Sequence, residues 1–454
     1  MKEHKRQPGK RPQRSHHRTK PTRRAKPAAR PVRLTLRVQS MGRGGDGMAR
    51  TEERASDARL VPVPFTLPAE TVDADVADAR GTLQAVLDAS PERREPLCRH
   101  HGRAELDHPC GSCALQHWRT EPYRAWKRGL LVSALERAGL EAEVDPLVPC
   151  PTGARRRLVL AARRTDDGVV LGFNTLRSDR IVDMAECSVA QPELVAALPH
   201  LRAILPDLIP SSARARITLL LTETGIDMRV DAETSAPHAM PSLPKTIVRL
   251  SWGDEVLLER SVPVLQFGSV AVTPPPGGFV QAVAEAEQAM ADLVTAHLSS
   301  TSRALDLFAG SGTFALRLAA TMSVHAVEGE AAPLRALDRA WRGGQRLRHV
   351  TTERRDLMRR PLMANEIDGT DRPGAKPFDA AVIDPPRAGA EAQSRQLARS
   401  GARRVAMVSC NPVTLARDLA IMLDGTGFRL DRVVPIDQFV FTPHLEAVAL
   451  LRRD

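Results

Sequence analysis

The chain has 454 residues, of which 42% are hydrophobic and 26% are charged. This composition is typical of a globular protein with more than one domain. No apolar run reaches the roughly 18 residues that a membrane-spanning helix needs, and six cysteines are too few for a disulfide framework in so long a chain. We therefore expect a cytoplasmic protein with reduced thiols and no membrane partner.

The net charge of +11 is confined to the N-terminal end. Residues 1–30 hold twelve Lys or Arg and one acidic residue, Glu3, so the rest of the chain balances to zero. Repeated prolines and the lack of apolar periodicity predict a disordered basic tail over residues 1–31. Such a tail would strengthen binding to a polyanion without reading its sequence. A solubilising extension or a misplaced start codon is the alternative.

Residues 32–92 carry short runs that alternate apolar and polar side chains. Leu34, Leu36 and Val38 form one run, and a second begins at Val61, with the glycine-rich segment 42–47 between them. Alternation with such turns predicts a small β-barrel. The order of these segments resembles a TRAM domain, which is an OB-like RNA-binding barrel.

A cysteine cluster opens the segment 93–270, which we expect to form a central α+β domain. Cys98, Cys110 and Cys113 lie within sixteen residues, and the last two form a Cys-x-x-Cys pair. Three thiolates in this spacing predict a metal site whose fourth ligand is Cys150 or Cys187. Zinc and an iron–sulfur cluster both fit four thiolates.

The rest of this segment is less informative. Residues 122–140 have the pattern of an amphipathic helix, and residues 154–164 that of a strand with arginines at both ends. Those arginines either bind phosphates or are the solvated ends of a sheet.

The segment 271–454 has the pattern of a parallel α/β sheet. A strand at 304–308 leads into a turn with Gly310 and Gly312 and then an apolar helix, and a second strand ends at Glu328. This order places ligands at the carboxyl ends of the strands. A dinucleotide usually requires a third glycine in such a turn. Its absence favours S-adenosylmethionine, since Gly-x-Gly followed by Thr313 resembles motif I of the class I methyltransferases.

Two further motifs indicate the reaction. A third strand ends in Asp384-Pro-Pro, but Arg387 follows where amine methyltransferases commonly carry an aromatic residue. The lone Cys410 in "VSCNP" suits a different chemistry, because C5 of a pyrimidine becomes nucleophilic once a thiolate has added to C6. A nearby carboxylate must then remove the C5 proton. The segment "DPPRAG" lacks the cysteine that cytosine-C5 enzymes carry there, which favours uracil.

Four segments together, "DLFAGSGTF", "DPPRAG", "SCNPVTLARD" and "DQFVFTPHLEAVALLRR", resemble the bacterial RNA uracil-5-methyltransferases, in particular the 23S ribosomal RNA branch with a TRAM domain and an iron–sulfur cluster. The resemblance covers residues 32–454. It implies Cys410 as the nucleophile and Glu446 as the base. It also implies Phe279 as a residue that stacks on the target base.

The same resemblance implies the ligands of both cofactors. S-adenosylmethionine would contact Gln281, Phe308, Thr313, Glu328, Asp356 and Asp384, the last also touching the uracil. A 4Fe-4S cluster would be held by Cys98, Cys110, Cys113 and Cys187, which leaves Cys150 spare. Eleven residues separate Cys98 from Cys110 where the family usually has about five, and Thr313 replaces a common asparagine.

We therefore expect a class I methyltransferase domain over 271–454, behind the barrel and the central domain, acting as a monomer on 23S ribosomal RNA. One alternative is a transfer-RNA uracil-5-methyltransferase. The other is a non-catalytic RNA-binding or RNA-folding protein of the same fold, which would have no need for Cys410, Glu446 and Asp384 together.

Overall fold

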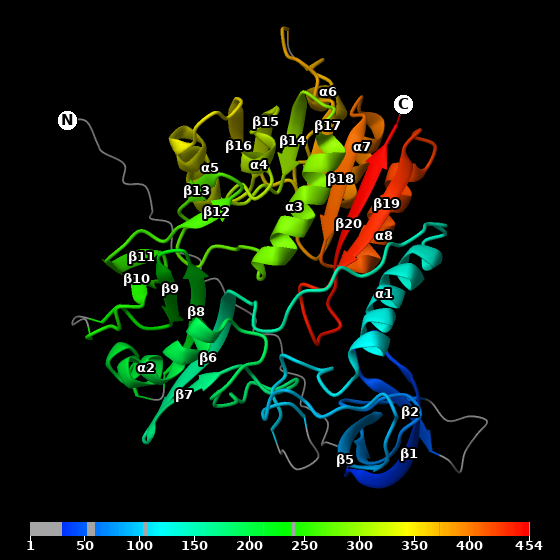
Figure 1. Ribbon diagram of the computed structural model, residues 1–454, viewed down its shortest axis with the longest axis vertical. Helices are drawn as coiled ribbons and strands as arrows, with labels where there is room; N and C mark the ends of the chain where they lie inside the picture. The colour runs from blue at the N-terminus through cyan, green and yellow to red at the C-terminus, as the bar shows by residue number, and fades with distance from the viewer. Residues whose placement is uncertain are drawn as a thin grey trace, which may run out of the picture.

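The computed structural model describes residues 30–51, 60–102, 108–211, 213–237, 241–371 and 373–453. The predicted basic tail lies outside these ranges except for its last two residues. Within the described part, no helix combines the length and the apolar character needed to cross a membrane. The described residues form three larger sheets and the two-stranded sheet β12-β13. In Figure 1 the N-terminal sheet (blue) lies far from the C-terminal one (yellow to red).

The N-terminal sheet is antiparallel and has the strand order β3-β2-β1-β4-β5. Its strands are β1 (Val32–Met41), β2 (Gly47–Thr51), β3 (Val61–Val63), β4 (Thr71–Ala77) and β5 (Arg80–Asp88). The alternating apolar side chains point inward, so that Leu36, Val38 and Val63 share one core. The sheet curls until its edge strands meet: a Cβ on Gly81 in β5 would lie 2.7 Å from Val63 Cγ2 in β3.

The central sheet has the order β11-β10-β9-β8-β6-β7. Its strands are β6 (Arg157–Thr165), β7 (Gly168–Gly172), β8 (Arg214–Thr222), β9 (Gly225–Ala232), β10 (Ile247–Trp252) and β11 (Glu255–Glu259). Helix α2 (Pro192–Leu208) packs its apolar face, including Leu194, Leu198 and Leu201, into the same core as Leu158 and Ile217 of the sheet. The arginine-flanked strand predicted over 154–164 corresponds to β6.

The C-terminal sheet has seven strands in the order β16-β15-β14-β17-β18-β20-β19. They are β14 (Arg303–Leu307), β15 (Ser323–Glu328), β16 (Val350–Arg354), β17 (Ala380–Ile383), β18 (Arg404–Ser409), β19 (Arg429–Ile436) and β20 (Glu446–Arg452). The first five in the order run parallel, whereas β20 is antiparallel to both neighbours. The carboxyl ends of β14, β17 and β18 therefore share one edge with the start of β20.

Both faces of this sheet are covered, which explains why its strands are almost wholly apolar. The helices are α3 (Ala284–Leu298), α4 (Ala315–Leu318), α5 (Ala331–Gly343), α6 (Ala364–Ile367), α7 (Glu391–Arg399) and α8 (Pro412–Leu423). Alternate residues face opposite cores, as with Leu305 toward α7 and α8 and Ala304 toward α3. The predicted helix after the glycine turn is only the short α4, since β15 begins five residues after its end, at Ser323; Leu316 and Leu318 are buried.

Two further elements join the sheets. Helix α1 (Thr120–Arg137), predicted from its amphipathic pattern, buries Leu131 and Leu135 in the same core as Leu415 and Leu419 of α8. Figure 1 shows α1 just below α8. The hairpin β12 (Leu265–Phe267) and β13 (Val270–Val272) packs with Leu220 of the central sheet and Leu316 of α4. The C-terminal sheet is thus held against the central part of the chain from both sides.

Candidate active site

Three predicted site residues meet at the carboxyl edge of the seven-stranded sheet. Asp384 follows β17 and Cys410 follows β18. Glu446 is the first residue of β20, and because Ser409 pairs with Ala447, the antiparallel register sets Glu446 beside Cys410. Glu446 is only 2% exposed, whereas Cys410 is half-buried and so remains open to a ligand.

A chain of amide side chains joins the two carboxylates. The Gln281 Nε2 group donates to Asp384 Oδ2 at 3.2 Å. Gln438 Nε2 donates to Gln281 Oε1 at 2.8 Å and to Glu446 Oε2 at 3.1 Å. Gln438 is 3% exposed and was missed by the sequence analysis, although it lies within the terminal motif "DQF". These hydrogen bonds fix the orientation of both carboxyl groups.

Burial sets the proton affinity of this group. It raises the pKa of Asp384 to about 7 and that of Glu446 well above its usual range, with the Asp384 charge adding to the second shift. The pKa of Cys410 is raised to about 11, first by burial and then by the charge of Glu446, while Arg387 opposes the shift. A carboxylate formed at Glu446 is therefore a stronger base than one in water.

The backbone directly after Cys410 is held by the hydrogen bonds of Asn411. The Asn411 side chain accepts a hydrogen bond from Val413 N at 3.1 Å and so caps α8, with Pro412 as the first helical residue. The same side chain donates to the Arg387 carbonyl at 2.9 Å, which ties the loop after β17 to that after β18. Cys410 thus lies directly before a helix N-terminus, where the helix dipole favours a thiolate.

The glycine turn lies at the same edge of the sheet. Phe308 and Gly310 have φ of 65° and 54°, and a Cβ on Gly310 would meet nothing within 4 Å, so the turn is open on that side. Glu328 Oε2 accepts from Gly310 N at 2.9 Å. Asp306, which the sequence analysis did not single out, is fully buried, and within the described ranges its Oδ1 has no hydrogen-bond partner.

The remaining predicted residues are less tightly placed. Thr313 is half-buried and follows the turn, and its carbonyl accepts from Arg317. Asp356 is exposed after β16, and its carboxylate accepts from the backbone N–H of Met358 at 3.1 Å. Phe279 is 70% exposed, so its ring is free to stack on a ligand.

The cysteine cluster forms a second site. Cys98, Cys110, Cys113 and Cys187 line one cavity. Burial raises the pKa of Cys98 to about 11 and that of Cys113 to about 12, so these thiols carry protons unless a cation stabilises their thiolates. Cys150 is not among the lining residues and instead packs with Ala154 in the core of the C-terminal sheet.

Two other possible ligands lie beside the thiols and were missed by the sequence analysis. His100 Nδ1 is 3.5 Å from Cys98 Sγ, and Glu186 offers a carboxylate oxygen within 4.8 Å of both. The cavity is nevertheless lined by four thiols, and thiolates are soft ligands that fit zinc or an iron–sulfur cluster better than a hard cation. The signal for His100 was present in "CRHHG", between the first two cysteines.

The strand order, the glycine turn and the carboxyl-edge residues define the class I methyltransferase fold. Comparison with known proteins identifies the family. Residues 353–454 match the family described as tRNA (Uracil-5-)-methyltransferase. An uncharacterized RNA methyltransferase of Brucella suis is 48% identical over 425 residues, covering 92% of this chain and 97% of that protein. The chain belongs to the RNA uracil-5-methyltransferase family.

Two other comparisons concern substrate and fold. The 23S rRNA (uracil(1939)-C(5))-methyltransferase RlmD of Pectobacterium atrosepticum is 32% identical, covering 95% of this chain and 96% of that protein. The crystal structure of a Pyrococcus abyssi tRNA (uracil-54, C5)-methyltransferase with S-adenosyl-L-homocysteine has a TM-score of 0.68 at 22% identity, over 92% of this chain and all of that one. The predicted fold class and family are thereby confirmed.

Proposed function

We propose that this protein methylates C5 of a uracil in 23S ribosomal RNA, with S-adenosylmethionine as the methyl donor. One observation carries the proposal: the register of β18 and β20 sets a lone cysteine and a buried carboxylate side by side at the ligand-binding edge of a methyltransferase sheet. A thiol and a base are the two groups that methylation at C5 requires.

The first step belongs to Cys410. Its thiolate adds to C6 of the uracil, and the electrons of the C5–C6 double bond move toward C5 and the C4 carbonyl, giving an enolate that is nucleophilic at C5. The dipole of α8 and the charge of Arg387 favour the thiolate against the effects of burial and of Glu446. Bound S-adenosylmethionine supplies an electrophilic methyl group to C5.

The last step belongs to Glu446. Its carboxylate removes the C5 proton, the C5–C6 double bond forms again, and the thiolate of Cys410 leaves C6. Gln438 holds the carboxylate in one orientation, and Gln281 links it to Asp384. We assign Gln438 as a positioning residue and Asp384 to contact with both the donor and the uracil.

The donor site is assigned to the glycine turn and its neighbours. The open side of Gly310 offers space for S-adenosylmethionine. Hydrogen-bond acceptors are available at the unpaired Oδ1 of buried Asp306 and at the carboxylate of Glu328. We assign Gln281, Phe308, Thr313, Asp356 and Asp384 to the same ligand. Phe279, which is largely exposed, is assigned to stacking on the flipped base.

Ribosomal RNA is favoured over transfer RNA because the RlmD relative covers nearly the whole chain at 32% identity. We also infer that the curled sheet at 32–92 is a TRAM-like RNA-binding module, that residues 93–270 form the central domain, and that the enzyme acts as a cytoplasmic monomer. Transfer RNA remains the alternative, since the family described for residues 353–454 is named for it.

The substrate is tested by comparing RNA from a strain that lacks the gene with RNA from its parent. We expect one 5-methyluridine to disappear from 23S ribosomal RNA, and purified enzyme with S-adenosylmethionine to restore it there. Loss of the modification from transfer RNA alone would overturn the ribosomal assignment, whereas an unchanged set of 5-methyluridines would overturn the activity.

We propose that Cys98, Cys110, Cys113 and Cys187 hold a 4Fe-4S cluster. The four thiols line one cavity between the segment 98–113 and the segment around Cys187, so the cluster would join two parts of the chain that are far apart in sequence. The free energy of cluster binding would then stabilise the folded form of both segments.

Removal of one ligand tests the cluster. Anaerobically purified protein is expected to be brown and to contain about four iron atoms per chain, and Cys113→Ser is expected to lose iron, colour and thermal stability. Cys150→Ser is the matched control, since its thiol lies outside the cavity, and it should keep the iron. Colourless protein with one zinc per chain would rule out the iron–sulfur cluster.

A further inference from the structure

A second cavity lies at the opposite edge of the seven-stranded sheet from Cys410. It has a volume of about 650 Å³. Arg303 and Arg404 are the first residues of β14 and β18, and Arg452 is the last residue of the antiparallel β20, so all three lie where the strands end away from the active site. We call it the basal cavity. Nothing in the proposed methyl transfer uses it.

The lining of the basal cavity is strongly basic. Six cations line it, together with a single acid, Asp379; the cations are Arg303, Lys376, Arg403, Arg404, Arg452 and Arg453. Asp379 accepts hydrogen bonds from the backbone N–H groups of Ser302 and Arg303, at 3.0 and 2.9 Å, and so fixes the start of β14. It forms no ion pair with these six cations. Arg452 is paired with Asp431 outside the cavity, which still leaves a large positive excess.

Two of the arginines are held in place by packing. The Arg303 guanidinium lies over the Phe378 ring at 4.8 Å, and its Nε donates to the Pro377 carbonyl at 3.2 Å. The Arg453 guanidinium lies over the Phe428 ring at 4.4 Å. The contacts of Arg303 fix its guanidinium before any ligand arrives, so little side-chain entropy is lost when an anion binds. Arg453 also donates to the carbonyls of Ala402, Thr426 and Ser400, so three of its five N–H donors are already used.

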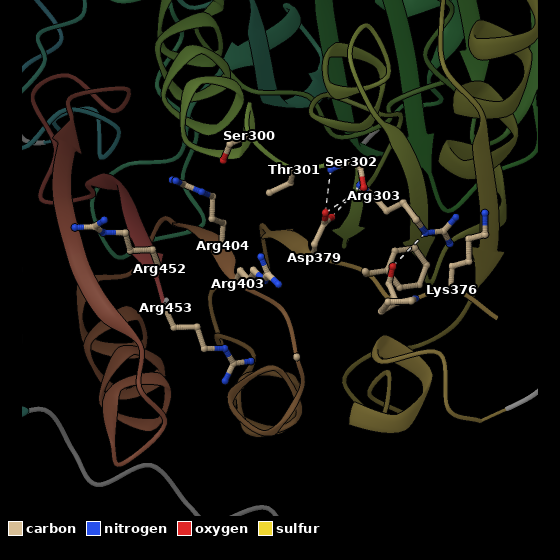
Figure 2. A pocket seen from close by; sticks show the side chains of 13 residues that line it. Ser300, Thr301, Ser302, Arg303, Lys376, Asp379, Arg403, Arg404, Arg452 and Arg453 are labelled. Atoms are coloured by element: carbon tan, nitrogen blue, oxygen red, sulfur yellow. Dashed lines mark hydrogen bonds between the residues drawn. The ribbon is translucent and has the colours of Figure 1, made fainter. Parts of the chain in front are cut away.

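Other cations in the cavity have unused donors. Lys376 and Arg403 are exposed, and neither side chain has a hydrogen bond or ion pair to another described residue. Arg404 uses one N–H, toward the His297 carbonyl at 3.2 Å. Figure 2 shows Arg403 and Arg404 on one side of Asp379 and Lys376 on the other. The unused donors of these three cations are available to the oxygens of a phosphate group.

We propose that the basal cavity binds a backbone phosphate of the RNA substrate, far from the uracil that is methylated. This inference rests on the proposed function, which makes a large folded RNA the substrate. The six residues of β18 span about 20 Å, so a phosphate in the basal cavity belongs to a nucleotide well separated from the target. The RNA would therefore contact two opposite edges of the sheet.

The test removes the two cations with no partner among the described residues. The variant Lys376→Ala with Arg403→Ala is compared with Arg335→Ala with Arg339→Ala, which removes the same charge from the exposed face of α5. Binding is measured against salt concentration for a long RNA that contains the target region and for a short stem-loop around the target uridine. We expect the cavity variant to bind the long RNA about tenfold more weakly, with a salt slope smaller by about 1.

Kinetics give a second readout. For the long RNA, KM should rise in the cavity variant while kcat at saturating RNA stays the same, and for the short stem-loop neither should change.

Equal binding and equal salt slopes for the cavity variant and the control would overturn the inference. Calorimetry with inorganic phosphate separates the two sources of the anion: phosphate binding that the variant loses, with RNA binding unchanged, would also overturn it. The binding measurement does not require methyl transfer. Its result therefore tests the basal cavity even if the proposed methylation is wrong.

Discussion

Cys410→Ala is expected to lower methylation at C5 by at least about 10⁴-fold, because the uracil then has no route to an enolate. The variant should still bind RNA, since Asn411 continues to cap α8 and to hold the loop at Arg387. The measurement is transfer of labelled methyl to RNA, together with denaturing electrophoresis for a covalent protein–RNA species. Neither product nor adduct should form.

Two comparisons make this result specific to the thiol. Cys150→Ala removes another buried cysteine, outside both proposed sites, and should leave turnover nearly unchanged. RNA with 5-fluorouridine at the target should trap the wild-type enzyme as an adduct, because fluorine cannot leave C5 as a proton does, and should not trap Cys410→Ala. Full methylation by Cys410→Ala would show that the cysteine is not the nucleophile.

Glu446→Gln is expected to stop the reaction after methyl transfer, because an amide cannot remove the C5 proton. The side chain keeps its size, and its carbonyl oxygen can still accept the hydrogen bond that Gln438 donates to Oε2 at 3.1 Å in the wild type. Since the charge of Glu446 raises the pKa of Cys410, the neutral amide lowers that pKa, and attack on C6 at neutral pH is not slowed. A methylated protein–RNA adduct should therefore accumulate and survive denaturing electrophoresis.

The turnover number of Glu446→Gln should fall by about 10² to 10⁴-fold, while the first addition of methyl to RNA proceeds at close to the wild-type rate. Glu391→Gln is the matched control, because that carboxylate pairs with Arg395 on the surface of α7, and it should turn over normally. An inactive Glu446→Gln without adduct would mean that the carboxylate acts before or during attack, which contradicts its role as the last base.

Much of the fold and of the candidate site could be predicted because the residues concerned lie in short contiguous segments of the sequence. The strand ending at Asp384 and the cysteine before Asn411-Pro412 each combine a local conformation with a candidate site residue, and the turn at Gly310 combines one with an open backbone. Local sequence also predicted α1 and β6. In a parallel α/β sheet the carboxyl ends of strands share an edge whatever their order, so these residues could be expected to meet.

What local sequence could not give is the contact between segments. Gln438, in the loop between β19 and β20, contacts both Glu446 and Gln281, and Gln281 lies 157 residues away in the chain. Helix α4 is shorter than its helical pattern predicted. The basal cavity is a stronger case. Its cations come from β14, from the segment before β17, from the start of β18 with the residue before it, and from the end of β20 with the residue after it. In the sequence, each of these residues looks like an ordinary solvated Lys or Arg.

The physical reason is the same in each case. Strand order and the antiparallel insertion of β20 decide which side chains become neighbours, and that order follows from the burial of whole sheet faces against α1, α3 and α8 rather than from any one segment. The sequence alone determined the family, the fold class and the residue types at the carboxyl edge of the seven-stranded sheet. The tertiary structure alone decided the partners of those residues and gathered six cations at the opposite edge.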